Sequence, residues 1–106
     1  MNLNYFVIER PILEAHRAWS DEKFGKENGP VGPLKHLSEE ALEAAENPTD
    51  IIEYADCMFL MLDALHRGGF TMEDLNRAME HKLTILKSRT YHKPKDGEPS
   101  RHVKEE

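Results

Sequence analysis

The spacing of apolar residues over the first half of the chain predicts two amphipathic helices. The first begins near Pro11, which suits the first turn of a helix, and is expected to end before Phe24. Three glycines and a proline between residues 25 and 32 indicate a loop. The second helix begins at Pro33, and its apolar residues recur at helical spacing, namely Leu34, Leu37, Ala41, Ala44 and Ala45.

Two further helices are predicted in the second half. The third runs from about Pro48 to Arg67, with Asn47 as its cap, and ends at a pair of glycines. Thr71 opens a sequence typical of a capping box, which starts a fourth helix that ends near Arg89. Because the links between these helices are short, neighbouring helices are expected to be antiparallel and to form a four-helix bundle.

The two ends of the chain carry little helical signal. Residues 5–8 form the only β-like run and are expected to be an extended lead-in that packs on the core. After the fourth helix, prolines and a glycine indicate an irregular tail that is rich in Lys, Arg and His. The sequence therefore predicts an all-α chain with a helical domain over residues 1–92 and a tail over residues 93–106.

The third predicted helix is apolar on every side between Ile51 and Leu65. A helix of this kind has to be enclosed, because none of its faces is polar enough to meet water. A bundle this small cannot enclose a helix fully, so we expect a second copy of the chain to cover the remaining face. The bundle is therefore predicted to be completed by oligomerisation, as a homodimer or a homotetramer.

Acidic side chains interrupt this apolar helix. Glu53 and Asp56 are spaced i,i+3 and project on the same face, which Asp63 continues. An unpaired carboxylate is costly to bury, so each of these groups needs a cation, a proton or hydrogen bonds. For Asp63 we expect a basic partner such as Lys82 or Lys87.

A matching pair of acids lies on the second helix. Glu40 and Glu43 are also spaced i,i+3, and His36 lies one turn before Glu40 on the same side. One such pair is typical of a solvated surface, but two pairs on consecutive antiparallel helices predict that the carboxylates converge. Converging carboxylates need a compensating cation, and a set of oxygen ligands favours Mg²⁺, with Mn²⁺ as the alternative.

Composition and charge narrow the classes of function. A chain of 106 residues is expected to be one domain, and a formal net charge of -6 lacks the basic footprint of a protein that binds nucleic-acid polymers. No stretch reaches the ~20 apolar residues of a membrane span, and no signal peptide is recognisable, so a cytoplasmic protein is the default expectation. The single cysteine, Cys57, excludes an intrachain disulfide and is expected to be a small core residue.

The acidic motifs also carry a family resemblance. Residues 39–43 followed by residues 53–56 resemble the EExxE…ExxD signature of the MazG-type, all-α nucleoside-triphosphate pyrophosphohydrolases. The likeness covers nearly the whole chain and is strongest to the phage and bacterial dATP/dGTP diphosphohydrolase (MazZ-like) branch. The segments that carry it are Trp19, Phe24-Gly25 and residues 32–37, 67–69, 89–91 and 99–103. Leu86 and Tyr91 depart from this branch, which often has Asn and Trp at these positions.

The resemblance implies metal-dependent hydrolysis of a (deoxy)nucleoside triphosphate to the monophosphate and pyrophosphate. Its branch implies a purine deoxynucleotide, dGTP or dATP, in the cytoplasm of a bacterium or of an infected host cell. The implied metal ligands are Glu40, Glu43, Glu53 and Asp56, and Glu40 is also placed in the catalytic machinery. Glu39 is the candidate that orients or deprotonates the attacking water, and a solvated surface glutamate is the alternative.

Basic side chains are the candidates for binding the phosphates. Lys82, Lys87 and Arg89 lie on or after the fourth helix, and Lys35 is a further candidate on the second. Each of them alone is typical of a solvent-exposed helix charge, so only the group as a whole favours a phosphate clamp.

Aromatic side chains and one histidine are the candidates for contacts with the base. Trp19 is the first choice for stacking on a nucleobase and Phe24 the second, against the alternative that both are plain core. His36 is expected to contact the base or to support a metal ligand, and a structural histidine is the competing interpretation.

Two other functions stay open at this point. One is a non-enzymatic, acidic helical module that oligomerises and binds a partner through its grooves. It fits the amphipathic helices but leaves the acids within the third helix unexplained. The other is a phosphohydrolase that releases phosphate and dNDP, since the residues alone do not determine which phosphate bond breaks.

Overall fold

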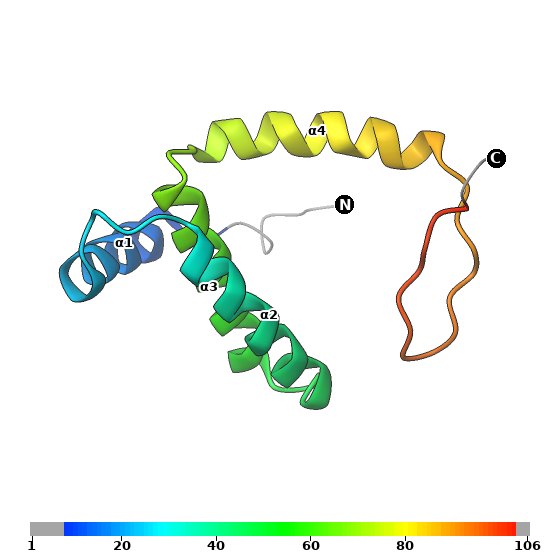
Figure 1. Ribbon diagram of the computed structural model, residues 1–106, viewed down its shortest axis with the longest axis horizontal. Helices are drawn as coiled ribbons and strands as arrows, with labels where there is room; N and C mark the ends of the chain where they lie inside the picture. The colour runs from blue at the N-terminus through cyan, green and yellow to red at the C-terminus, as the bar shows by residue number, and fades with distance from the viewer. Residues whose placement is uncertain (1–7, 104–106) are drawn as a thin grey trace. The chain divides into compact units, whose positions relative to one another are not determined.

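The computed structural model describes residues 8–103, which form four α-helices and no strand (Figure 1). The prediction of an all-α chain with four helices is confirmed. Most of the apolar run predicted as a lead-in, residues 5–7, lies outside the described residues. The helices are α1 (Arg10–Phe24), α2 (Val31–Glu46), α3 (Ile51–Arg67) and α4 (Met72–Ser88).

The chain divides into two compact units. The first, Met1–Phe70, contains α1, α2 and α3, and the second, Thr71–Glu106, contains α4 and the tail. The predicted boundary between a helical domain and a tail after residue 92 stays a prediction, as does completion of the bundle by further copies of the chain. None of the helices in the described part of the chain is long and apolar enough to cross a membrane.

Glycine and proline set the ends of α1 and α2, one or two residues away from the predicted positions. Helix α1 includes Phe24 and ends at Gly25, whose φ of 83° is readily adopted only by glycine. Helix α2 begins at Val31, with Pro30 before it, rather than at Pro33. The first turn of a helix has no intrahelical acceptors for its N–H groups, so a proline at its third position breaks no hydrogen bond.

The turn between α2 and α3 brings these two helices side by side in opposite directions (Figure 1). Asp50, not Asn47, caps α3: its carboxylate accepts a hydrogen bond of 3.0 Å from the N–H of Ile52. Asn47 instead ends α2, since its side-chain amide donates to the carbonyl of Glu43. The acid pairs of both helices therefore lie at the end of the hairpin close to its turn.

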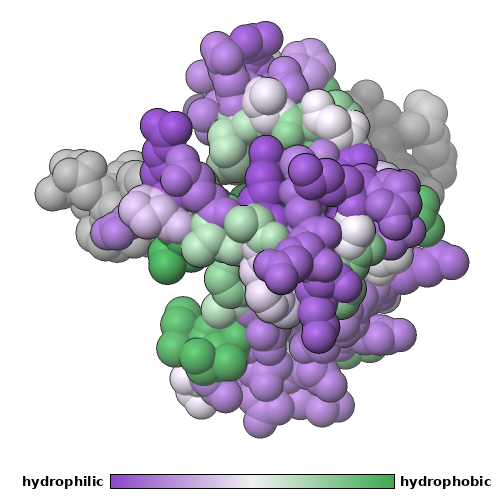
Figure 2. All heavy atoms as spheres, turned by 90° about the vertical axis from the view of Figure 1, so that its left-hand side faces the viewer, coloured by the Kyte–Doolittle hydropathy of each residue, from purple (hydrophilic) through white to green (hydrophobic). Residues whose placement is uncertain are grey.

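Few apolar side chains of the described residues are enclosed. Ala64 is the one apolar residue among them that is buried, at 5% exposure, and it lies next to the buried Asp63. Ile51 and Ile52 on α3 are 74% and 63% exposed. Figure 2 shows hydrophobic side chains lying open among hydrophilic ones on one face. Helix α3 therefore has the apolar surface that the sequence predicts, and part of this surface is exposed.

In the second unit, local signals determine both ends of α4. The hydroxyl of Thr71 accepts from the N–H of Asp74, whose carboxylate accepts from the N–H of Thr71 in return. The predicted capping box is thus confirmed, and the helix ends at Ser88, close to the predicted end. The tail that follows is closed by an isolated antiparallel bridge between Tyr91 and His102.

Candidate metal centre and adjoining cleft

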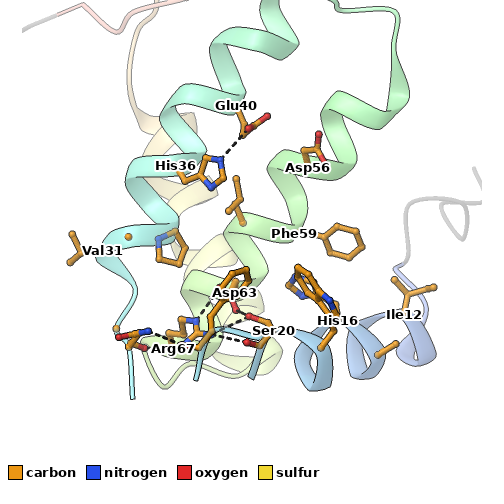
Figure 3. A pocket seen from close by; sticks show the side chains of 18 residues that line it. Ile12, His16, Ser20, Val31, His36, Glu40, Asp56, Phe59, Asp63 and Arg67 are labelled. Carbon is orange, nitrogen blue, oxygen red and sulfur yellow. Dashed lines mark hydrogen bonds and ion pairs between the residues drawn. The ribbon is translucent and has the colours of Figure 1, made fainter. Parts of the chain in front are cut away.

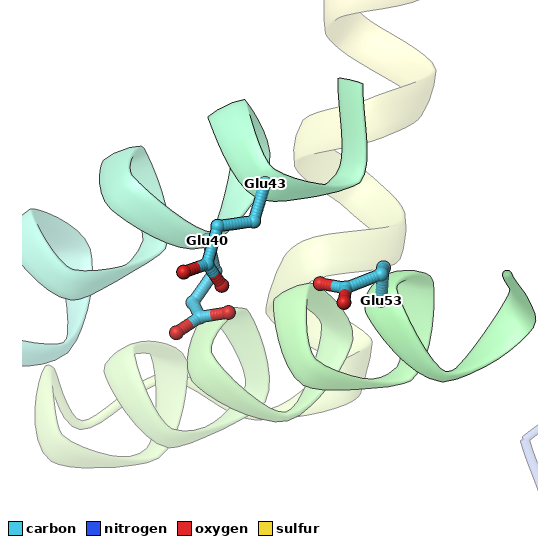
Figure 4. A group of neighbouring side chains, drawn as sticks. All are labelled: Glu40, Glu43 and Glu53. Atoms are coloured by element: carbon cyan, nitrogen blue, oxygen red, sulfur yellow. The ribbon is translucent and has the colours of Figure 1, made fainter. Parts of the chain in front are cut away.

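Three carboxylates converge between α2 and α3. Glu40 and Glu43 project from one side of α2, and Glu53 faces them from α3 (Figure 4). Each residue offers a carboxylate oxygen, and these oxygens all lie within 4.8 Å of one another. The i,i+3 spacing puts the first two on one side of their helix, and the antiparallel turn brings the third opposite. We call these three residues the carboxylate cluster.

Asp56, the fourth acid named from the sequence, lies beside this cluster and not in it. It is exposed on α3, one turn beyond Glu53, and lines a cleft together with Glu40 (Figure 3). Glu39 is exposed on α2 and belongs neither to the cluster nor to the lining of the cleft. The roles assigned to these acids stay predictions.

The electrostatics of the carboxylate cluster fit a bound cation. A hydrogen bond with Glu43, burial and the negative charge of Glu43 raise the pKa of Glu40, against the opposing effect of His36. Burial, followed by the charges of Glu43, Asp50 and Asp56, raises the pKa of Glu53. One oxygen of Glu53, Oε2, is buried without a hydrogen-bond partner among the described residues. Ligands that consist of oxygens alone suit a hard divalent cation.

The cleft that begins at these acids is formed by α1, α2, α3 and the α1–α2 loop. Its volume of about 1080 Å³ is slightly above the range of about 300–1,000 Å³ that is typical of small-molecule sites. Figure 3 shows Glu40 and Asp56 at one end and Ser20, Asp63 and Arg67 at the other. An acidic end that continues into a long cleft suits a ligand with a charged and an uncharged part.

Aromatic rings line the cleft. Trp19 and Phe24, the two rings named from the sequence, both line it and meet edge to face, with centroids 5.4 Å apart. Sequence reasoning missed two more: His16 is stacked on Phe59, with centroids 4.4 Å apart and planes 20° apart. Burial lowers the pKa of His16, and the charge of Asp63 opposes this shift, so the ring is mainly neutral at pH 7. The i,i+3 spacing of His16 and Trp19, which puts both on one face of α1, was the sequence signal that could have identified His16 as a cleft residue.

Asp63 has a basic partner, as predicted, but the predicted identity was wrong. Its carboxylate pairs with Arg67, at 3.0 Å from Nε, and accepts a hydrogen bond of 2.7 Å from the hydroxyl of Ser20. Arg67 lies one turn further along the same helix, within direct reach of Asp63. Lys82 and Lys87, the partners named from the sequence, belong to the second unit.

Comparison with known sequences decides the family. Residues 12–106 match the model of the dATP/dGTP pyrophosphohydrolase family. The chain belongs to this family. It is also 55% identical, over 95 residues, to the Eaa protein of Salmonella phage P22, an alignment that spans 90% of this chain and 30% of that protein. The chain thus covers under a third of the length of this relative.

A solved structure with the same fold is the MazG-like pyrophosphohydrolase of cyanophage S-2L. It has a TM-score of 0.69 and 27% sequence identity, and the alignment covers 92% of this chain and all of that one. That protein was solved with dGDP and three catalytic Mn²⁺ ions per active site. The MazG-type resemblance that the acidic motifs indicate is confirmed.

The remaining residues predicted to bind the substrate differ in whether they line the cleft. His36 lines the cleft, and its Nε2 lies 3.1 Å from Oε1 of Glu40, so it contacts a cluster carboxylate directly. Lys35 is exposed on α2 and is not part of the lining. The basic residues proposed as a phosphate clamp belong to the second unit, and their role stays a prediction; they are Lys82, Lys87 and Arg89.

Proposed function

We propose that this chain hydrolyses purine deoxynucleoside triphosphates, dGTP or dATP, to the monophosphate and pyrophosphate with the help of a divalent cation. One observation carries the proposal: the carboxylate cluster opens into an aromatic cleft, in a chain that belongs to the dATP/dGTP pyrophosphohydrolase family. The dGDP and Mn²⁺ bound to the cyanophage structure support both the substrate class and the need for metal.

The acids would hold the metal. Glu40, Glu43 and Glu53 bring oxygens together from two helices, and Asp56 would complete the set from the adjacent rim of the cleft. When bound, Mg²⁺ or Mn²⁺ supplies positive charge to the triphosphate and lowers the pKa of water. Both ions accept carboxylate oxygens, so Mg²⁺, the cation expected from the ligand set, and Mn²⁺ are both proposed as cofactors.

The other side chains near the cluster would prepare the reaction. His36 orients the carboxylate of Glu40 through their contact. Glu39 is proposed to orient the water that attacks the α-phosphorus, or to accept its proton. The cations proposed to bind the phosphates are Lys35, Lys82, Lys87 and Arg89.

The aromatic side chains that line the cleft are proposed to hold the base. Trp19 is 54% exposed, lines the cleft and meets Phe24 edge to face, so its ring is accessible to a base that enters the cleft. Base stacking on an aromatic ring contributes about 1–3 kcal/mol. A purine has the larger ring system and gains more from such a surface than a pyrimidine.

We also propose that a second copy of the chain covers the open apolar side of α3, so that the protein acts as a homodimer or a homotetramer. The exposed Ile51 and Ile52 support this, since apolar patches of such side chains mark association surfaces. Sedimentation equilibrium checks it: a mass of two or four times 12.2 kDa is expected, and a monomer at all concentrations contradicts it.

The central test is a panel of ribo- and deoxynucleotides incubated with Mg²⁺ or Mn²⁺, with the products separated by chromatography. Monophosphate and pyrophosphate from dGTP or dATP are expected. Diphosphate and phosphate would identify a different phosphohydrolase, and the absence of any product would favour a binding module. For substitutions of the cluster glutamates, Glu46→Gln is the matched control, because Glu46 is an exposed glutamate on α2 outside the cluster.

A further inference from the structure

The end of the cleft away from the acids contains a buried hydrogen-bond network around one guanidinium group. The side chain of Arg67 is only 3% exposed. It donates to the carboxylate of Asp63 at 3.0 Å and to the hydroxyl of Ser20 at 3.1 Å. It also donates to three backbone carbonyls, those of Gly25 at 2.7 Å, Asn28 at 3.2 Å and Ser20 at 3.4 Å. We call this set of residues the Arg67 network.

Two of these carbonyls belong to the α1–α2 loop, which forms part of the cleft wall through Asn28 and Gly29. The loop is short of other interactions. The side-chain amide of Asn28 donates to the carbonyl of Phe24, and the N–H of Gly25 donates to Asp21. These bonds fix the start of the loop to the end of α1. Among the hydrogen bonds and ion pairs of the described residues, only those of the guanidinium group connect the loop to α3.

The same helix carries the other end of the cleft. Glu53 and Arg67 are separated by 14 residues of α3, which corresponds to about 21 Å of helix. Since α3 is continuous between them, a loop held by Arg67 has a defined position relative to the carboxylate cluster. A cleft wall that is fixed before the ligand arrives lowers the entropy cost of binding.

We propose that Arg67 is a positioning residue for the nucleotide: it holds the α1–α2 loop so that the wall of the cleft is already formed when the ligand binds. This inference rests on the proposed function for the identity of the ligand. The proposal includes no contact between Arg67 and the metal, so it predicts different effects on nucleotide binding and on metal binding. Loss of the network weakens nucleotide binding and leaves metal binding unchanged.

The test compares Arg67→Lys with a matched control. Lysine keeps the positive charge beside Asp63, but a single ammonium group cannot reproduce the guanidinium fork, in which Nε donates to Asp63, Nη1 to the two loop carbonyls and Nη2 to Ser20. Arg10→Lys is the control, because Arg10 bonds to Glu14 one turn along α1 at 2.7 Å but is 87% exposed. Ser20→Ala is a second, milder variant that removes one hydroxyl from the network.

Two binding measurements are made on the full chain, Mn²⁺ alone by calorimetry and dGDP with Mn²⁺ by the fluorescence of Trp19, the single tryptophan. We expect Arg67→Lys to raise the Kd of dGDP about tenfold, which is the effect of losing about one charged hydrogen bond. The Kd of Mn²⁺ should stay at the wild-type value. Ser20→Ala should weaken dGDP binding less, and Arg10→Lys should change neither constant.

Amide hydrogen exchange provides the structural readout. In Arg67→Lys, exchange should become faster at residues 25–29, while the amides of α2 and α3 near the carboxylate cluster keep their wild-type rates. Wild-type affinity for dGDP in this variant would overturn the inference. A parallel loss of Mn²⁺ affinity and helix content would also overturn it, because Arg67 would then serve the whole fold.

Failure of the proposed function gives a different result. If the wild-type chain releases no pyrophosphate from any nucleotide, the proposed reaction is wrong. A loss of dGDP affinity confined to the network variants would still support the positioning role. If the wild-type chain binds no dGDP at all, the positioning of a nucleotide is overturned together with the reaction.

Discussion

The carboxylate cluster and the Arg67 network lie toward opposite ends of α3, and both withdraw charged groups from water. In the cluster the charges have one sign: the pKa values of Glu40 and Glu53 are raised, and Oε2 of Glu53 has no hydrogen-bond partner among the described residues. In the network the charge of Arg67 is matched by Asp63, and its donors have acceptors. Uncompensated charge of this kind indicates a place for a ligand, and compensated charge stabilises a shape.

The largest effect is expected from removing one of the charges proposed to bind the metal, at Glu53 in the cluster or at Asp56 beside it. Glu53→Gln and Asp56→Asn should each lower the rate of pyrophosphate release by at least about 100-fold, because even indirect disturbance of a metal ligand costs about 10–100-fold. Helix content should stay at the wild-type level, since neither carboxylate has a hydrogen-bond partner to lose among residues 8–103. Rates from single-turnover assays with Mg²⁺ check this. Wild-type turnover in either variant would remove the acids from the site.

Removing a charge from the network should affect stability instead. Arg67→Ala leaves the carboxylate of Asp63 buried without its partner, and breaking a buried pair in this way costs about 3–5 kcal/mol. Urea unfolding followed by circular dichroism measures the loss. Arg10→Ala breaks an exposed pair with the same i,i+4 spacing and should change the unfolding free energy much less. Equal effects in the two variants would contradict the comparison.

Adding metal should stabilise the chain through the cluster alone. At a Mn²⁺ concentration of 100 times its Kd, the folded state gains about 2.7 kcal/mol, which raises the melting temperature. The rise should be absent in Glu53→Gln and reversed by EDTA in the wild-type chain. Glu46→Gln should behave like the wild-type chain. A rise of equal size in Glu53→Gln would place the bound cation elsewhere.

The smallest effect is expected at the aromatic rings that line the cleft. Trp19→Leu removes the proposed stacking surface and should raise KM for dGTP about tenfold, within the ~1–3 kcal/mol that stacking contributes. The rate constant kcat should change little, because the ring is proposed to bind the base and not the reacting phosphate. Steady-state kinetics separate the two constants. A fall in kcat with unchanged KM would show that Trp19 does not act through base binding.

The chain's local features follow from residues close together in sequence. Apolar periodicity predicts the four helices, and the capping box at Thr71 fixes the start of α4. The i,i+3 acid pairs indicate the cluster, because spacing on a helix determines which side chains share a face. The acidic motifs are also sufficient to indicate the family. The sequence predicts Asn47 as the cap of α3, but the cap is Asp50, three residues later. Both residue types are good caps, and only the backbone angles distinguish them.

What depends on the crossing of separate helices was decided by the tertiary structure. The sequence does not show that His16 meets Phe59 from a different helix, or that Asp56 stands beside the cluster instead of within it. It contains Arg67 at the right spacing from Asp63, yet the contact with the α1–α2 loop exists only because α1 lies across the far end of α3. Helix periodicity fixes the face on which a residue lies, and the packing angle between helices fixes what that face meets.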